Sequence, residues 1–238
     1  MRDNGERGEP PAGGPGGEQI LLVGNPTSRQ GKAAARIEEA RELLVRRGLE
    51  HDFRETLPDG ETTGMVAGAL QERPYRTVIY LGGDGTFNEV AKGICLSGRA
   101  SEVRIGMLPS GTANDQGKSF GISSRPRAIE ENVDVIAADH TTRLDVGEVK
   151  AIANDGTVLR RDLFFDSIGW GLSAAILQFR NRELDAVKSI PIWRDMYRDH
   201  MVYIRAAVHQ LGLAWLTRDH FAAELDRKST RLNSSHYS

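Results

Sequence analysis

Short apolar runs alternate with helical patterns over the first 140 residues of the chain. The run from Ile20 to Val23 is continuously apolar, which is typical of a strand covered on both faces of a parallel sheet. From Lys32 to Arg47 the apolar residues recur at helical spacing, and Gly48 is expected to end this helix. The same alternation continues downstream, and it predicts strands over residues 51–56, 77–81 and 103–108 and helices over residues 62–71, 87–96 and 127–138.

Strands that alternate with helices predict a parallel sheet with right-handed crossovers. Ligands of such sheets bind beyond the carboxyl ends of the strands. The polar loops at Asn25, Gly82 and Ser110 each follow an expected strand. We therefore expect these three loops to gather at one edge of the sheet.

The pattern changes near Thr141, where the alternation of strands and helices stops. Two segments of strand composition, residues 143–152 and 157–165, flank Asn154-Asp155-Gly156, and this arrangement indicates an antiparallel hairpin. We place a domain boundary close to Thr141, with an antiparallel domain after it. A later helix is expected over residues 196–211, where the apolar residues again recur at helical spacing.

The two ends of the chain differ in composition from the rest. Residues 1–18 are rich in glycine, proline and charge. We expect a disordered leader there, because the segment lacks the apolar surface that would offset its ordering entropy. Residues 228–238 are polar without periodicity and resemble translated adapter or vector sequence, so we expect a non-native tail. A natural disordered tail is the alternative.

Composition and charge narrow the classes of function. The 238 residues suffice for one large domain or two modest ones, and a net charge of -2 provides no global basic field for nucleic acid. The single cysteine, Cys95, excludes an internal disulfide and fits a reducing cytoplasm. No apolar run approaches the roughly 20 residues that span a bilayer. We therefore expect a cytoplasmic protein whose membrane contact is peripheral.

The strongest chemical motif is Gly82–Val90, with the sequence Gly-Gly-Asp-Gly-Thr-Phe-Asn-Glu-Val, directly after an expected strand. Glycines let the backbone approach a ligand closely, and successive N–H groups can bind a phosphate. Thr86 is expected to cap the following helix, whose N-terminal end favours phosphate. Asp84 would repel a phosphate directly, so we expect it to act through Mg²⁺, a proton or a hydroxyl. A plain glycine turn is the alternative, which this nine-residue string disfavours.

Two weaker polar strings also follow expected strands. Pro109–Asp115 contains a glycine turn at Gly111. Within it, Thr112 offers a hydroxyl and an N–H to phosphate, and Asp115 offers a second carboxylate. An ordinary turn explains this string equally well. The string Asn25–Ser28 opens a helix, and by itself it is explained as a helix cap.

Together these three strings resemble the catalytic domain of the diacylglycerol kinases, especially the bacterial soluble lipid kinases. The resemblance is specific over about residues 19–124. It continues more loosely through Leu144–Gly147, Phe164–Gly169 and Lys188-Ser189. It implies an enzyme that transfers the γ-phosphate of ATP to a lipid hydroxyl with Mg²⁺, with diacylglycerol as acceptor and phosphatidic acid as product.

The implied fold class is α/β, with a parallel-sheet nucleotide-binding domain at residues 19–140. An incomplete antiparallel β-sandwich domain would occupy residues 141–227, and the nucleotide would lie in the cleft between the two domains. The implied partners are ATP and a membrane lipid reached by peripheral contact, without nucleic acid. A homodimer is left open, because half of a β-sandwich has an open sheet edge.

The resemblance also implies roles for individual residues. Nucleotide contacts are implied for Asn25, Thr56, Gly82, Gly83, Asp84, Gly85, Thr86, Phe87, Asn88 and Thr112. Asp84 and Asp115 resemble the catalytic carboxylates that organise phosphate and metal, with Asp84 as a Mg²⁺ ligand through ATP. Asp145 resembles an acidic residue at the domain junction. Lys118 and Lys188 resemble basic, phosphate-organising positions, for which a plain surface charge is the alternative.

Two departures from the family pattern matter. Relatives usually have glycine directly after the Asn-Pro-x-Ser string, whereas Arg29 and Gln30 precede Gly31 here, so either Arg29 or Lys32 could face phosphate. Relatives also carry strands after the helix that resembles residues 196–211. Those strands supply an Asp-Gly-Glu motif, whose glutamate is the proposed general base, and a structural Mg²⁺ site; neither occurs here. We therefore expect a C-terminally truncated member of the family.

Other functions stay open from the sequence alone. NAD kinases also use a Gly-Gly-Asp-Gly loop in a similar domain, although the loops at Asn25 and Gly111 fit lipid kinases better. Kinases of sphingoid bases or ceramide share the ATP motifs, because the choice of acceptor lies largely outside them. A non-catalytic nucleotide-binding fragment is the alternative of a different class, since the expected general base is missing.

Overall fold

The computed structural model describes residues 19–26, 32–111, 113–125, 127–166 and 230–235. Apart from Asp166, these residues belong to one compact unit. The expected leader at residues 1–18 and the expected helix at residues 196–211 lie outside the described residues, as do Thr112 and Lys188. Within the described part of the chain, no helix combines the length and the apolar character needed to cross a membrane.

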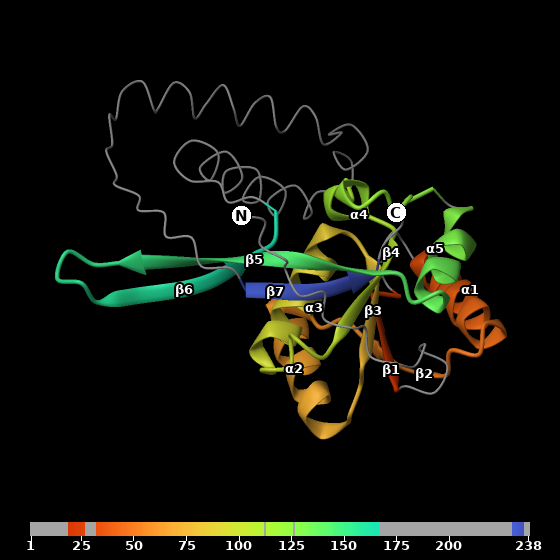
Figure 1. Cartoon of the computed structure of the whole chain (residues 1–238), viewed down its shortest axis with the longest axis horizontal. Helices are drawn as coiled ribbons and strands as arrows, with labels where there is room; N and C mark the ends of the chain where they lie inside the picture. Colours follow the sequence, from red (N-terminus) through yellow and green to blue (C-terminus); the bar gives the residue numbers. More distant parts are fainter. Residues whose placement is uncertain (1–18, 27–31, 112, 126, 167–229, 236–238) are drawn as a thin grey trace, which may run out of the picture. The chain divides into compact units, whose positions relative to one another are not determined.

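Four parallel strands form the centre of this unit (Figure 1). They are β1 (Ile20–Gly24), β2 (His51–Glu55), β3 (Thr77–Gly82) and β4 (Arg104–Pro109). Their order in the sheet is β2-β1-β3-β4, and all neighbouring pairs are parallel. Every residue of β1 is buried, as its apolar run predicts. The predicted α/β parallel sheet is therefore confirmed.

Four helices occur where the sequence predicts them. They are α1 (Lys32–Arg46), α2 (Thr62–Glu72), α3 (Asp84–Leu96) and α5 (Ala128–Ala137). Gly48 follows the end of α1 with a φ of 73°, a left-handed conformation that glycine adopts readily. Two short helices have no counterpart in the sequence pattern, namely the 3₁₀ helix η2 (Pro58–Gly60) and α4 (Asp115–Ser119).

The helices cover both faces of the parallel sheet (Figure 1). Leu21 and Val23 of β1 belong to a core that includes α2 and α3. Ile20 and Leu22 belong to a second core that includes α1 and α5. Successive side chains of a strand point to opposite faces, so one strand contributes to both cores. Burial on both faces explains why the strand is continuously apolar.

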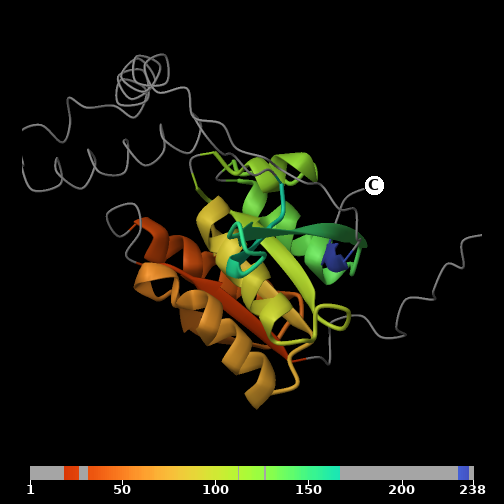
Figure 2. The ribbon, with the colours of Figure 1, turned by 90° about the vertical axis from the view of Figure 1, so that its left-hand side faces the viewer.

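An antiparallel hairpin follows the parallel strands, as the sequence predicts. β5 (Thr141–Ile152) pairs with β6 (Val158–Phe164), and the residues between them include Asn154-Asp155-Gly156. Asp155 Oδ1 accepts the N–H of Thr157 at 2.9 Å, which stabilises the turn. The two strands extend beyond the helices in Figure 1, and Figure 2 looks onto their turn.

A short strand, β7 (Thr230–Ser235), lies between β4 and β5. It is parallel to β4 and antiparallel to β5, so it joins the hairpin to the parallel strands. The sequence pattern does not predict this strand. Strand pairing uses backbone N–H and C=O groups, so a polar segment without apolar periodicity can form it. The domain boundaries and the foreign origin of residues 228–238 stay predictions.

Candidate functional site

The carboxyl ends of the parallel strands lie together at one edge of the sheet. The N–H of Thr56 donates to the carbonyl of Gly24 at 3.0 Å, next to the loop at Asn25. The N–H of Ser110 donates to the carbonyl of Gly82 at 2.7 Å. These two bonds join the end of β1 to that of β2, and the end of β3 to that of β4. The prediction that the three polar loops gather at one edge is confirmed.

The glycine motif forms the N-terminus of α3. Gly83 is the cap residue with an extended backbone, and its carbonyl accepts the N–H of Phe87 at 3.0 Å. The N–H groups of Asp84, Gly85 and Thr86 precede this bond and have no partner within the helix. Such a helix end attracts anions, because the free N–H groups and the helix dipole both favour negative charge.

The expectation that Thr86 caps this helix is wrong. α3 begins at Asp84, three residues before the predicted start, so Thr86 lies inside the first turn. The cap residue is Gly83, which has no side chain that could form a capping hydrogen bond. The Thr86 side chain packs against Gly82 instead, where an added Cβ atom would overlap Oγ1 of Thr86. Glycine is therefore required at residue 82, because Thr86 fills the space that a side chain there would need.

The two glycine loops that follow β3 and β4 are in direct contact. A Cβ atom added to Gly111 would lie 2.5 Å from Cα of Gly83 and 2.9 Å from Oδ1 of Asn114. A Cβ atom added to Gly83 would lie 3.1 Å from Cα of Gly111. A side chain at residue 111 would therefore force a backbone shift. The two loops approach as closely as their backbones allow, which only glycine permits.

The carboxylate of Asp84 connects α3 to α4. Its Oδ1 accepts the N–H of Gln116, in the first turn of α4, at 3.2 Å. Asp84 therefore holds the start of α4 against the glycine loops. The sequence does not indicate this bond, because the two residues are 32 positions apart.

The second predicted carboxylate, Asp115, is the first residue of α4. Its Oδ1 lies 3.1 Å from Nζ of Lys118, and both side chains are exposed. Because Gln116 is bonded to Asp84, the structure brings both predicted carboxylates to the same pair of loops. Asp145 is exposed on β5, which β4 and β7 separate from β3 in the sheet.

Aromatic side chains pack against the start of α3. The ring of Phe87 makes edge-to-face contacts with Tyr80 of β3 and with Phe165, at centroid distances of 5.5 Å and 5.6 Å. Burial of Tyr80, with an additional contribution from the charge of Asp84, raises the pKa of its hydroxyl well above its usual value. Tyr80 is therefore neutral at neutral pH, and the packing holds the first turn of α3 in place.

Asn114 is a residue of this site that the sequence pattern does not single out. Its side chain is buried and hydrogen-bonded to Gly111. An asparagine in a polar turn carries no mark in the sequence that separates a buried side chain from a solvated one. Among the other predicted positions, Arg29 lies outside the described residues, and so does the side chain of Lys32.

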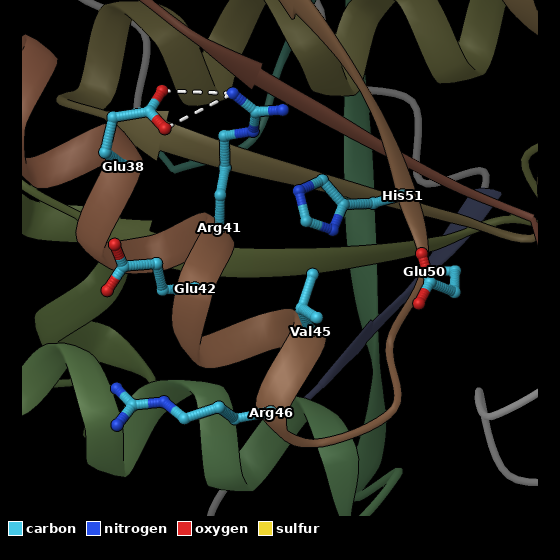
Figure 3. A pocket seen from close by; sticks show the side chains of 7 residues that line it. All are labelled: Glu38, Arg41, Glu42, Val45, Arg46, Glu50 and His51. Carbon is cyan, nitrogen blue, oxygen red and sulfur yellow. Dashed lines mark hydrogen bonds and ion pairs between the residues drawn. The ribbon is translucent and has the colours of Figure 1, made fainter.

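A separate pocket of about 560 Å³ lies between α1 and the start of β2 (Figure 3). Arg41 points toward Glu38 in this view, with 3.0 Å between Nη1 and Oε1. No residue of the predicted site lines this pocket, so we do not assign the predicted chemistry to it. Its lining residues are Glu38, Arg41, Glu42, Val45, Arg46, Glu50 and His51.

The fold and the loops define an α/β domain with an anion-binding helix N-terminus at the carboxyl edge of a parallel sheet. Residues 19–149, more than half of the chain, match the family described as "Diacylglycerol kinase catalytic domain". The chain belongs to this family, and the resemblance seen in the sequence is confirmed.

Curated relatives include a diacylglycerol kinase from Staphylococcus haemolyticus, 35% identical over 128 residues, which are 54% of this chain and 37% of the relative. Another from Staphylococcus carnosus is 33% identical over 134 residues, 56% of this chain and 42% of the relative. The chain thus spans about two fifths of the length of these relatives. A solved structure of a diacylglycerol kinase from Bacillus anthracis is 23% identical with a TM-score of 0.47, covering 55% of this chain and 44% of that one.

Proposed function

We propose that this protein is an ATP-dependent lipid kinase that transfers the γ-phosphate of ATP to the hydroxyl of diacylglycerol. The observation that carries the proposal is the contact between the two glycine loops at the N-terminus of α3, in a member of a kinase family. Backbone donors that are fixed before a ligand arrives stabilise phosphate charge without further reorganisation. Phosphoryl transfer depends mostly on such positioning and charge stabilisation.

The nucleotide would lie along the carboxyl edge of the sheet. Asn25 and Thr56 are placed at the ends of β1 and β2, where they would border the nucleotide. Gly82–Asn88 and Thr112 would surround the phosphates. The N-terminus of α3 supports this assignment, since its first three N–H groups have no partner within the helix.

The carboxylates suit a Mg²⁺ ion that is shared with ATP. Magnesium prefers oxygen ligands and commonly takes one or two carboxylates together with substrate phosphates. Asp84 and Asp115 come from one pair of loops. Among the described residues, no group of three or more metal-ligating side chains forms a separate metal site. We assign Asp84 as the carboxylate ligand and Asp115 as a group that organises phosphate, while the ion would neutralise part of the phosphate charge.

The remaining assignments rest on the family resemblance. Lys118, which is paired with Asp115, would turn toward phosphate when ATP is present. Asp145 and Lys188 would organise the junction with a second domain. The lipid acceptor would be reached by peripheral contact with the cytoplasmic face of a membrane.

Phosphoryl transfer from radiolabelled ATP tests this function. Diacylglycerol, sphingosine and ceramide are each supplied in mixed micelles, and NAD is supplied in solution. We expect labelled phosphatidic acid to form slowly, because the general base that the resemblance implies does not occur in this sequence, and the rate to fall at least about a hundredfold further for Asp84→Asn. The matched control Asp155→Asn changes a carboxylate in the hairpin turn and should leave the rate unchanged.

Each of the other possible outcomes of this assay would indicate a different function. Transfer to sphingosine or ceramide would change the acceptor but keep a lipid kinase. Transfer to NAD alone would contradict a lipid kinase. Binding of ATP without transfer to any acceptor would indicate a nucleotide-binding protein that is not catalytic.

A further inference from the structure

Asn114 combines three unusual properties in the loop between β4 and α4. Its backbone is left-handed, with φ 53° and ψ 46°, and the residue is only 2% exposed. Its side chain makes two hydrogen bonds of 2.7 Å, and both go to Gly111. Oδ1 accepts the N–H of Gly111, and Nδ2 donates to the carbonyl oxygen of Gly111. We call this pair of bonds the Asn114 bracket.

The bracket requires the chemistry of an amide. The backbone of Gly111 presents one donor and one acceptor to the same side chain, and the amide oxygen and nitrogen of asparagine match both at once. The partners also fix which end of the amide is oxygen and which is nitrogen. An aspartate would place an acceptor opposite the carbonyl oxygen of Gly111. Asparagine is in addition one of the few residues with a side chain that tolerates a left-handed backbone.

The bracket lies where three connections between the loops meet. Through Gly111 it holds the close contact with Gly83, the N-terminal cap residue of α3. The carbonyl oxygen of Asn114 accepts the N–H of Lys118 at 3.1 Å, and Asn114 is the N-terminal cap residue of α4. The first turn of α4 in turn donates to Asp84, in the first turn of α3. Rotation or loss of the Asn114 side chain would therefore loosen Gly111 against the N-terminus of α3, whose first N–H groups have no partner within the helix.

We infer that Asn114 is a positioning residue that sets the spacing between the two glycine loops for binding of ATP phosphates. The inference rests on the proposed function and deepens it, because Asn114 contributes through Gly111 and not through a contact of its own with the nucleotide. It follows that, at an equal loss of fold stability, loss of the bracket lowers the affinity for ATP more than loss of a buried bond elsewhere does.

Two variants separate the bracket from the backbone conformation. Asn114→Ala removes both bonds and disfavours the left-handed backbone, whereas Asn114→Gly removes both bonds but keeps that conformation accessible and is the variant expected to fold. The matched control is Asn132→Ala on α5. Asn132 is also 2% exposed, and its Nδ2 donates to the carbonyl oxygen of Ser123 at 2.8 Å. The control therefore removes a buried amide bond away from the glycine loops.

Calorimetric titration with ATP and Mg²⁺ is combined with melting temperatures and with amide hydrogen exchange at Gly111 and Gly83–Thr86. We expect both Asn114 variants to bind ATP about tenfold more weakly or worse, and to lose protection at the Gly111 amide. Asn132→Ala should lower the melting temperature but keep the affinity within about twofold.

Two results would overturn the inference. One is wild-type ATP affinity in Asn114→Gly. A loss of affinity in Asn114→Ala would then come from the backbone conformation and not from the two hydrogen bonds. The other is an equal loss of affinity in Asn132→Ala at an equal loss of stability. If the wild-type chain does not bind ATP at all, the proposed function fails instead. Hydrogen exchange at the Gly111 amide then tests the bracket by itself. Unchanged protection of that amide in Asn114→Gly would contradict the bracket.

Discussion

Two polar regions of the same compact unit differ in what they are made of. At the carboxyl edge, the loops at Gly83 and Gly111 meet backbone to backbone, and hydrogen bonds of Asn114 and Asp84 hold them. The pocket between α1 and β2 is instead a hollow whose wall consists largely of charged side chains. Arg41, for example, is already paired with Glu38.

The difference shows that a hollow in the surface is not by itself suited to binding phosphate. A phosphate needs several donors fixed in space, and free N–H groups at a helix N-terminus provide them without loss of side-chain entropy. The pocket has three glutamates beside two arginines and one histidine, so it offers an anion no net attraction. The following predictions test this contrast, beginning with the largest expected effect.

Gly83→Asp should abolish most of the ATP affinity. The new side chain would meet Cα of Gly111 at 3.1 Å, and its charge would lie where phosphate must approach. We expect a loss of several kcal/mol in binding free energy. Calorimetry with ATP and Mg²⁺ measures it. Gly64→Asp is the matched control, because a Cβ atom at this exposed position on α2 meets nothing within 4 Å. Equal affinities for the two variants would contradict the assignment of the glycine loop.

Gly111→Ala should destabilise the fold by about 1–3 kcal/mol, because the added methyl group overlaps Cα of Gly83. Gly68→Ala should instead raise the free energy of unfolding. Gly68 lies within α2 with nothing within 4 Å of an added Cβ, so alanine should stabilise by about 0.5–1 kcal/mol through helix propensity. Urea denaturation of both variants checks the pair. A stable Gly111→Ala variant with unchanged ATP affinity would show that the contact between the loops is not needed.

Asp162→Asn concerns a connection outside both regions. Asp162 Oδ1 on β6 lies 2.6 Å from Nζ of Lys92 on α3. Burial acts to raise the pKa of Asp162, but hydrogen bonds from Lys92 and the backbone of Leu163 outweigh it, and the pKa is lowered. The charged pair therefore stabilises the fold above the unfolded-state pKa of about 3.9, and this contribution is lost as the pH falls through the folded-state pKa.

We expect Asp162→Asn to lower the free energy of unfolding by less than about 1 kcal/mol at neutral pH, because the pair is partly exposed. The difference from wild type should shrink as the pH falls below about 4. Urea denaturation at several pH values measures it, and ATP affinity should stay unchanged. A difference of the same size at low and neutral pH would contradict the ionic origin.

Substitutions in the pocket should have the smallest effect. Glu42→Ala and Arg46→Ala remove charges that line it. We expect the free energy of unfolding to change by less than about 0.5 kcal/mol, as at other surface positions. ATP affinity, measured by the same titration, should equal that of the wild type. A clear loss of ATP affinity in either variant would indicate that the nucleotide binds in this pocket.

The sequence predicts the parts of the fold whose burial leaves a periodic pattern. β1 is apolar throughout because both of its faces are covered, and α1 shows helical spacing up to Gly48. The five residues of α4 (Asp-Gln-Gly-Lys-Ser) have no apolar periodicity, so the sequence does not predict that helix. β7 is missed for the same reason, since its partners are bound through the backbone.

The start of α3 shows a second kind of limit. Gly85 lowers helix propensity, and the apolar pattern begins only at Phe87, so the sequence places the start too late. The motif itself is visible in the sequence because glycine and aspartate in this order are unusual after a strand. The bonds of Asp84 and Asn114 are not visible, because they depend on side-chain burial and on contacts between separate segments of the fold.

Amide resonances during titration with ATP and Mg²⁺ test the central claim most directly, because they report on both polar regions of one wild-type sample. The account predicts saturable shifts, or protection from hydrogen exchange, at Gly83–Thr86 and Gly111, while Glu38–Arg46 and His51 stay unchanged. Changes confined to the pocket between α1 and β2, or none at the glycine loops under saturating ATP, would contradict it.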